Sequence, residues 1–319
     1  MAFIREKTVA GKTRYYAEKT VRIPGGKVTK ASVYIKDYDS KRKAQYLEEA
    51  SPILEQKSSE ISLNEAVSRY KKSRIFPEET INRIEGSRIG YKKILKKLTK
   101  NQMQDVIDRF TANFTYESNA IEGNSLTLKD VTFLFKENRT PAGKDLREIH
   151  ESINTREAMS LMFQGAFHID RESIIRLHSI LTKNTGVSPG YKRLPNFLLG
   201  RAIKTAPPEK VEAEMDALLD WHHKNSNIHP LERAAKFHGK FEQIHPFEDG
   251  NGRTGRMIVN AMLVADRYPP LIIRTSQRMS YFSALDAFDH GHEDKLKRFI
   301  IDRYLDTYEK FFKIYMKYI

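Results

Sequence analysis

Residues 244–265 constrain this chain more than any other stretch, because an almost wholly apolar run follows directly on a turn rich in glycine and charge. The apolar side chains of residues 257–265 would fall on every face of a helix. This pattern predicts a helix buried in the core. The preceding residues, 245–256, read HPFEDGNGRTGR. They must therefore lie where the buried helix begins.

The segment 245–256 has the composition of a phosphate-binding site. Free N–H groups at a helix N-terminus bind anions, and glycines let a ligand approach the backbone closely. Arg253 and Arg256 are three residues apart and share a helix face, with Asn260 one turn further along. Two guanidiniums beside such a turn suit a polyphosphate better than a single carboxylate. These features predict a nucleotide site.

His245 and Asp249 add the chemistry of group transfer. An imidazole can take a proton from a hydroxyl near neutral pH, and a carboxylate beside phosphates can hold Mg²⁺ or Mn²⁺. We therefore expect phosphoryl or nucleotidyl transfer, with His245 as general base and Asp249 as metal ligand. The glycines are not followed by the Gly-Lys-Ser/Thr of a Walker loop.

Residues 245–256 resemble the signature of the Fic family, His-Pro-Phe-x-Asp-Gly-Asn-Gly-Arg-x-x-Arg, at every fixed position. The resemblance implies a mainly α-helical core with a β-hairpin flap. It also implies transfer of AMP from ATP to a Ser, Thr or Tyr hydroxyl of a target protein. Gly252 stands where the kinase-like branch of the superfamily usually has Lys, which favours nucleotidyl over phosphoryl transfer. The expected phosphate and ATP contacts are Gly250, Asn251, Gly252, Arg253, Gly255, Arg256 and Asn260.

A shorter motif, Ser118-x-x-x-Glu122-Gly123, closes a helix expected over residues 102–122. A glutamate in the last turn faces the negative end of the helix dipole, so a nearby cation would stabilise it. The motif resembles the inhibitory helix of Fic proteins. This implies that Glu122 pairs with Arg256 and blocks seating of the ATP γ-phosphate. The same site could instead remove AMP, with Glu122 orienting water, and both directions remain open.

The rest of the sequence predicts a mainly α protein in four parts. They are a β-rich basic appendage at 1–40, a basic helical linker at 41–100, a helical segment with the inhibitory motif at 101–143, and a Fic-like catalytic core at 144–319. The linker is expected to contain helices over 41–57, 63–73 and 78–99. The core helices are expected at 145–163, 171–182, 208–221, 231–244, 277–287 and from 296 to the C-terminus. The flap is expected at 191–203.

Positive charge is concentrated at the N-terminal end. Residues 1–100 hold 24 Lys and Arg against 12 Asp and Glu, whereas the other 219 residues hold 31 against 29. Strands expected at 3–9, 13–23 and 28–35 carry Arg14, Lys19, Arg22, Lys27 and Lys30. Such a sheet can lie against nucleic acid, so a nucleic-acid-bound regulator acting through residues 1–100 is an alternative function. A packing or dimerising appendage is the other interpretation.

Composition limits the remaining functions. The chain has no cysteine, which excludes disulfides and thiolate metal sites and fits a cytoplasmic location. No apolar run is long enough to span a membrane, so no membrane partner is expected. An aromatic stripe over residues 299–312 is typical of core or of an oligomer interface, and a homo-oligomer is therefore among the expected assemblies.

Overall fold

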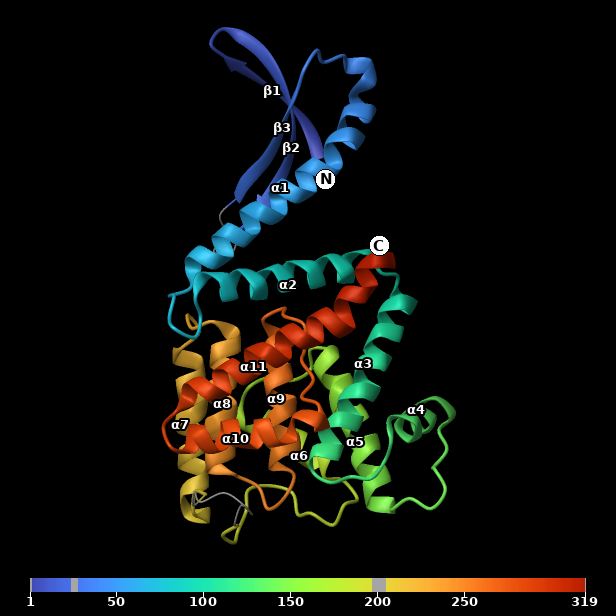
Figure 1. Cartoon of the computed structure of the whole chain (residues 1–319), viewed down its shortest axis with the longest axis vertical. Coiled ribbons are helices and arrows are strands. Elements are labelled where there is room, and N and C mark those ends of the chain that lie inside the picture. The colour runs from blue at the N-terminus through green and yellow to red at the C-terminus, as the bar shows by residue number, and fades with distance from the viewer. Residues whose placement is uncertain (1, 24–27, 197–204, 319) are drawn as a thin grey trace. The chain divides into compact units, whose positions relative to one another are not determined.

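The computed structural model describes residues 2–23, 28–196 and 205–318 (Figure 1). The chain divides into two compact units, Met1–Ile89 and Gly90–Ile319. Eleven α-helices and one three-stranded sheet lie within the described residues, which confirms the predicted mainly α fold with a small β appendage. None of the helices in these ranges is long and apolar enough to cross a bilayer.

The first unit begins with an antiparallel meander in the order β1-β2-β3. The strands are β1 (Ala2–Val9), β2 (Lys12–Arg22) and β3 (Val28–Ile35), close to the three predicted runs. Ala10 and Gly11 both have positive φ, 52° and 72°, and join β1 to β2 as a two-residue turn. Such turns suit the right-handed twist of the strands on either side.

Helix α1 (Lys43–Arg69) packs against one face of this sheet, as Figure 1 shows. The shared core contains Ala17, Val21, Ala31, Ile35, Ala50 and Leu54. The prediction of two helices, over 41–57 and 63–73, was wrong, because α1 is continuous. Its serines at 58, 59 and 62 donate their hydroxyls to carbonyls four residues earlier, so the polar stretch satisfies itself without ending the helix.

The second unit is helical. Helix α2 (Glu78–Lys97) spans the division, with residues 78–89 in the first unit and 90–97 in the second. The others are α3 (Lys100–Ile121), α4 (Leu128–Glu137), α5 (Leu146–Phe163), α6 (Arg171–Leu181), α7 (Pro208–Lys224), α8 (Pro230–Ile244), α9 (Asn251–Ala265), α10 (Arg278–Asp289) and α11 (Glu293–Thr307). A π-helical turn (Tyr308–Phe312) and a 3-10 segment (Lys313–Tyr318) follow α11, where a single helix to the C-terminus was expected.

Helix α9 occupies the middle of the second unit, as the apolar run at its C-terminal side predicted. It contacts α3, α5, α6 and α8, and the side chains from Met257 to Leu263 are all buried. Burying a large apolar side chain contributes about 1.5–3 kcal/mol. The start of α9 is therefore held firmly by the packing of its own body.

The flap hairpin was expected over residues 191–203. Residues 197–204, which include its apolar arm at 197–199, lie outside the described residues. Residues 191–196 are described and form bends rather than a strand.

Candidate active site

The site is built at the junction of α8 and α9. His245 ends α8 in the left-handed conformation, with φ 50° and ψ 61°, and its N–H donates to the Phe241 carbonyl over 2.8 Å. This backbone is unfavourable for a residue with a side chain, by about 1–3 kcal/mol. The chain then turns through residues 246–250, and Gly250, with φ 78°, precedes the first turn of α9. The turn places His245 on the wall of a cavity of about 770 Å³.

The side chains of Asn251 and His178 fix the conformation of this loop. Asn251 binds both backbone groups of Phe247, accepting from its N–H at 2.9 Å and donating to its carbonyl at 2.8 Å. The buried ring of His178 stacks on Phe247 at 3.8 Å, and its Nε2–H donates to the Asp249 carbonyl at 3.0 Å. Burial lowers the pKa of His178 to about 4, so the ring is neutral at physiological pH. Asn251 thus braces the loop, and it also lines the cavity in which it was predicted to contact a phosphate.

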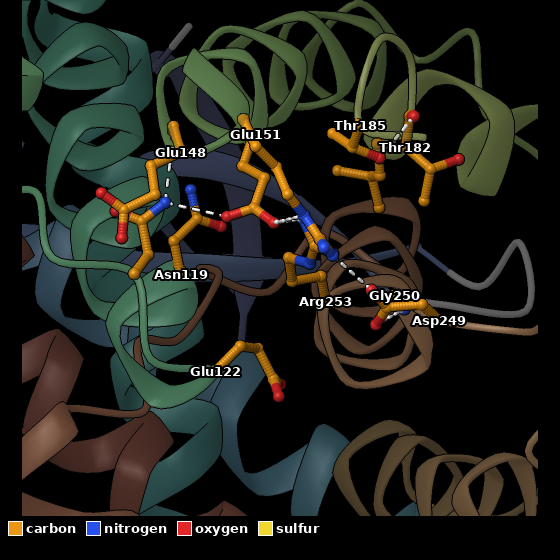
Figure 2. Close-up of polar contacts among 12 residues, drawn as sticks. Asn119, Glu122, Glu148, Glu151, Thr182, Thr185, Asp249, Gly250 and Arg253 are labelled. Atoms are coloured by element: carbon orange, nitrogen blue, oxygen red, sulfur yellow. Dashed lines mark hydrogen bonds and ion pairs between the residues drawn. The ribbon is translucent and has the colours of Figure 1, made fainter. Parts of the chain in front are cut away.

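Arg253 and Arg256 both point into the second unit rather than into solvent. Arg253 Nη1 lies 3.0 Å from Glu151 Oε1 of α5, a pair that Figure 2 shows side by side. Arg256 Nε donates to Ser118 Oγ at 3.0 Å, and its Nη2 donates to the Ser118 carbonyl at 2.8 Å. Arg256 Nη1 has no hydrogen-bond partner among the residues that the structure describes. One buried donor of Arg256 therefore remains for an anion.

Glu122, directly after the last turn of α3, contacts Arg256, as the resemblance to the Fic inhibitory helix implied. Its Oε1 lies 2.8 Å from Arg256 Nη2. Burial disfavours the charged guanidinium, but Glu122 outweighs it and raises the pKa of Arg256. The same carboxylate lies against Gly252, where even a single Cβ would overlap Glu122 Oε1. Gly123, with φ 101°, then ends the helix.

Asp249 directly precedes Gly250, the first glycine of the turn. Its Oδ1 accepts from the Gly250 N–H at 2.5 Å, and its Oδ2 pairs with Arg147 Nη2 at 2.6 Å. Burial would raise its pKa, but these donors and Arg253 lower it, so Asp249 is ionised at neutral pH. No cluster of three or more His, Asp or Glu suited to a metal occurs in the described ranges. One carboxylate fits Mg²⁺ nonetheless, because this ion usually takes one or two carboxylates together with substrate phosphates.

Two residues predicted as ATP contacts, Gly255 and Asn260, are not among the residues that line this cavity. Gly255 faces α8, where an added Cβ would come within 2.9 Å of both His238 and Glu242. This glycine therefore permits close helix packing. Asn260 is fully buried and binds Leu271, accepting from its N–H at 2.7 Å and donating to its carbonyl at 3.0 Å. Its stripe position was correctly identified, but its amide is engaged in fixing the chain after α9.

The structure adds two supports for His245 that the sequence did not suggest. Glu242, three residues earlier on α8, places Oε2 3.7 Å from His245 Nδ1 and is almost fully buried. Its spacing at the end of a helix was the available signal. A carboxylate beside the imidazole of a catalytic base orients the ring.

Lys192 is the second support, and it joins the flap region to the catalytic loop. Its buried amino group donates to Asn196 Oδ1 at 2.7 Å and to Thr205 Oγ1 at 3.0 Å, so it ties together the two ends of the segment outside the described residues. The backbone N–H of Lys192 donates to the Pro246 carbonyl at 2.8 Å, and Asn196 Nδ2 donates to the Phe247 carbonyl, also at 2.8 Å. Burial lowers the pKa of Lys192 to about 8.

The cavity is lined by the loop, by Glu122 and by α10, which contributes Tyr281 and Phe282. Its volume lies in the range of cofactor and small-ligand pockets. A second cavity, of about 610 Å³, lies among α3, α4 and α5 and contains none of the motif residues. The cavity beside His245 is therefore the candidate for ATP.

Residues 168–263 match the Fic/DOC family. The chain therefore carries a Fic/DOC domain, and α9 with its preceding loop is the core of it.

Similarity to individual proteins covers more of the chain than residues 168–263. The chain is 35% identical over 203 residues to the protein adenylyltransferase Fic of Nematostella vectensis, covering 60% of this chain and 47% of that protein. It is 30% identical over 195 residues to the protein adenylyltransferase fic-1 of Caenorhabditis elegans, covering 59% and 38%. The chain thus spans about half or less of the length of these curated relatives.

Solved structures share the fold. A Fic-domain-containing signaling protein of Bacteroides thetaiotaomicron matches with a TM-score of 0.66 at 25% identity, over 74% of this chain and 97% of that one. A fragment of Fic-1 from C. elegans matches with a TM-score of 0.65 at 18% identity, over 89% and 80%.

Proposed function

We propose that this protein transfers AMP from ATP to a hydroxyl side chain of a target protein. The observation that carries the proposal is the position of His245, on the wall of a 770 Å³ cavity that also exposes the glycine turn and Arg256. Base, anion donors and space for a nucleotide meet at one place. The names of the relatives, protein adenylyltransferases, point to the same reaction.

In this reaction His245 acts as the general base. Its Nδ1 faces Glu242 at 3.7 Å, which leaves Nε2 to take the proton of the target hydroxyl. The hydroxyl oxygen bonds to the ATP α-phosphorus as the bond from that phosphorus to the β-bridging oxygen breaks. AMP becomes esterified to the target, and pyrophosphate leaves. Glu242 stabilises the imidazolium until the proton is released.

The phosphates would be held by the first turn of α9. The free Arg256 Nη1 and the close approach allowed by Gly250 and Gly252 suit a polyphosphate. Asp249 would hold Mg²⁺ or Mn²⁺ once Arg147 releases it. Such an ion neutralises charge on the phosphates.

We further propose that Glu122 restrains the enzyme. Its carboxylate occupies Arg256 and the space above Gly252, which are the places that a terminal phosphate would use. ATP would have to displace it. A bound nucleotide and the Glu122–Arg256 pair are therefore alternatives, and the chain in this state is inhibited.

The reverse outcome, removal of AMP from a modified protein, uses the same residues. Glu122 favours it as a second candidate, because its carboxylate is 37% exposed on the cavity wall and could orient a water. The two functions differ in what happens to the target. The first adds an AMP group, and the second releases one.

The test is incubation of the full chain with α-labelled ATP and cell lysate, with mass spectrometry of labelled proteins. We expect label on Ser, Thr or Tyr with the wild type and none with His245→Ala. The exposed His292→Ala is the matched control and should label as the wild type does. Label at the wild-type rate with His245→Ala would overturn the role of His245. Loss of AMP from a pre-labelled target, without any gain, would favour the second candidate.

A further inference from the structure

The N-terminal sheet has two chemically different faces. Paired residues in an antiparallel sheet point to the same side, so the register assigns every side chain to a face. Ala17, Val21 and Ala31 lie on the face that α1 covers. We call the opposite side the cationic face, after its six basic residues Arg5, Lys7, Lys12, Arg14, Arg22 and Lys30.

The register changes the basic set predicted from sequence. Lys19 lies on the other face and pairs with Glu55 of α1. Lys27 lies outside the described residues. Arg14, Arg22 and Lys30 remain, and β1 adds Arg5 and Lys7. All three strands therefore contribute positive charge to one surface.

A buried acid organises the centre of the cationic face. The Glu18 carboxylate is fully buried, and it lies 2.5 Å from Lys7 Nζ, 3.4 Å from Lys30 Nζ and 3.6 Å from Arg5 Nη1. Ser32 Oγ also donates to it at 3.0 Å. One negative charge thus holds three cations in place. These cations keep 37–48% of their side chains exposed, so they can still reach a ligand.

Two aromatic rings on this face each carry a lysine ammonium. Lys7 Nζ lies over the Tyr16 ring at 4.7 Å, and Lys30 Nζ lies over the Phe3 ring at 5.4 Å. Tyr16 and Tyr34 also contact each other, with ring centroids 5.5 Å apart. Proteins that bind single strands stack bases on free ring faces. The arrangement here suits a ligand that presents phosphates rather than one that presents bases for stacking.

We propose that the cationic face binds double-stranded DNA. Three strands at about 4.8 Å spacing make a ribbon about 10 Å across, close to the roughly 12 Å width of the major groove. The major groove of an RNA duplex is too deep and narrow for side chains to read. Arg14 and Arg22 stand near opposite ends of β2, the central strand, and their long side chains would reach phosphates at two points along the groove, with the cluster around Glu18 between them.

The test uses the full chain and a fluorescent 20-base-pair duplex, with anisotropy read at salt concentrations from 50 to 200 mM. Arg14→Gln with Arg22→Gln removes two exposed charges without exposing Glu18. Each phosphate contact contributes about 0.9 to the slope of log affinity against log salt. We therefore expect the double variant to bind roughly ten- to a hundredfold more weakly near 0.1 M salt, with a slope smaller by about two.

Lys41→Gln with Lys43→Gln is the matched control. It removes the same charge from the same unit, next to the start of α1 rather than on the cationic face. It should bind DNA within about twofold of the wild type, since unscreened charge acts only over about 10 Å at this salt. Equal weakening by both double variants would overturn the proposal, as would an absence of duplex binding at 50 mM salt. Tighter binding to the single strand, to duplex RNA or to an acidic protein would also overturn it.

This inference stands apart from the proposed AMP transfer. Arg14→Gln with Arg22→Gln should leave AMP incorporation unchanged, and His245→Ala should leave duplex binding unchanged. Each proposal can therefore fail while the other holds.

Discussion

Replacing Glu122 with Gln should make the cavity bind ATP about tenfold more tightly. The side chain keeps its shape and loses its charge, so the pair with Arg256 at 2.8 Å is weakened without opening a hole. Arg256 would still donate to the oxygens of Ser118, which keeps the guanidinium partly satisfied and the fold intact. What changes is the competition between a carboxylate and a phosphate for one cation.

The magnitude follows from the contact. A hydrogen bond to a charged group contributes about 1.5–3 kcal/mol. The lower end applies, because the Glu122 side chain is 37% exposed and solvent screens its charge. Under the proposed inhibition ATP must displace this pair in the wild type, so removing the pair returns about 1.5 kcal/mol to binding, or roughly tenfold in Kd. Glu122→Gly also clears the space above Gly252 and should have the larger effect on transfer.

The assay is calorimetric titration with an ATP analogue that cannot be cleaved between its α- and β-phosphorus atoms, followed by rates of AMP incorporation. Asp108→Asn, an exposed neutralisation on the same helix, is the control for long-range charge. Its Kd should stay within about twofold of the wild type. If Glu122→Gln and Glu122→Gly leave both Kd and transfer unchanged, while His245→Ala abolishes transfer, the inhibitory role of Glu122 is refuted.

Three further predictions concern the same unit. His245→Ala should reduce AMP transfer by about 10²–10⁴-fold with little change in ATP affinity, as measured by label incorporation and calorimetry, and equal losses in both would contradict a general base. Asp249→Ala should remove the dependence of ATP binding on Mg²⁺, and a metal titration that matches the wild type would exclude Asp249 as ligand. The pKa of Lys192 is lowered from 10.5 to about 8 in the folded protein. Between these two pH values the unfolded chain binds more protons than the folded protein, so the free energy of unfolding rises with pH. From pH 8 to 10 the wild type should therefore gain stability relative to Lys192→Met, as measured by urea titration. A constant difference between the two unfolding free energies would refute this.

The sequence alone was sufficient where the signal is local. The glycines and the apolar run predicted where α9 begins and that its body is buried, because helix periodicity and turn preferences act over a few residues. The three strands were predicted within one or two residues for the same reason. The pair between Glu122 and Arg256, which the structure contains, was implied by the resemblance of Ser118-x-x-x-Glu122-Gly123 to the Fic inhibitory helix rather than by the residues alone.

What the sequence could not supply is which polar groups are already engaged. Asn251, Gly255 and Asn260 lie in or beside the motif, yet one braces Phe247, one packs on α8 and one binds Leu271. A motif identifies a position on a helix, and the partners come from other helices far away in the chain. Hydrogen bonding to those partners decides which side chains remain for a ligand.

The predicted and the observed sets of basic residues on the sheet differ for the same reason. Composition placed the basic excess in the first 100 residues, but only strand register shows that Lys19 faces α1 while Arg5, Lys7 and Lys30 surround Glu18 on the opposite face. Side chains alternate between the faces of a strand, so a shift of one residue would reverse every assignment. The local sequence therefore determined which reactive and charged side chains the protein has, whereas tertiary packing determined which of these side chains can contact a ligand.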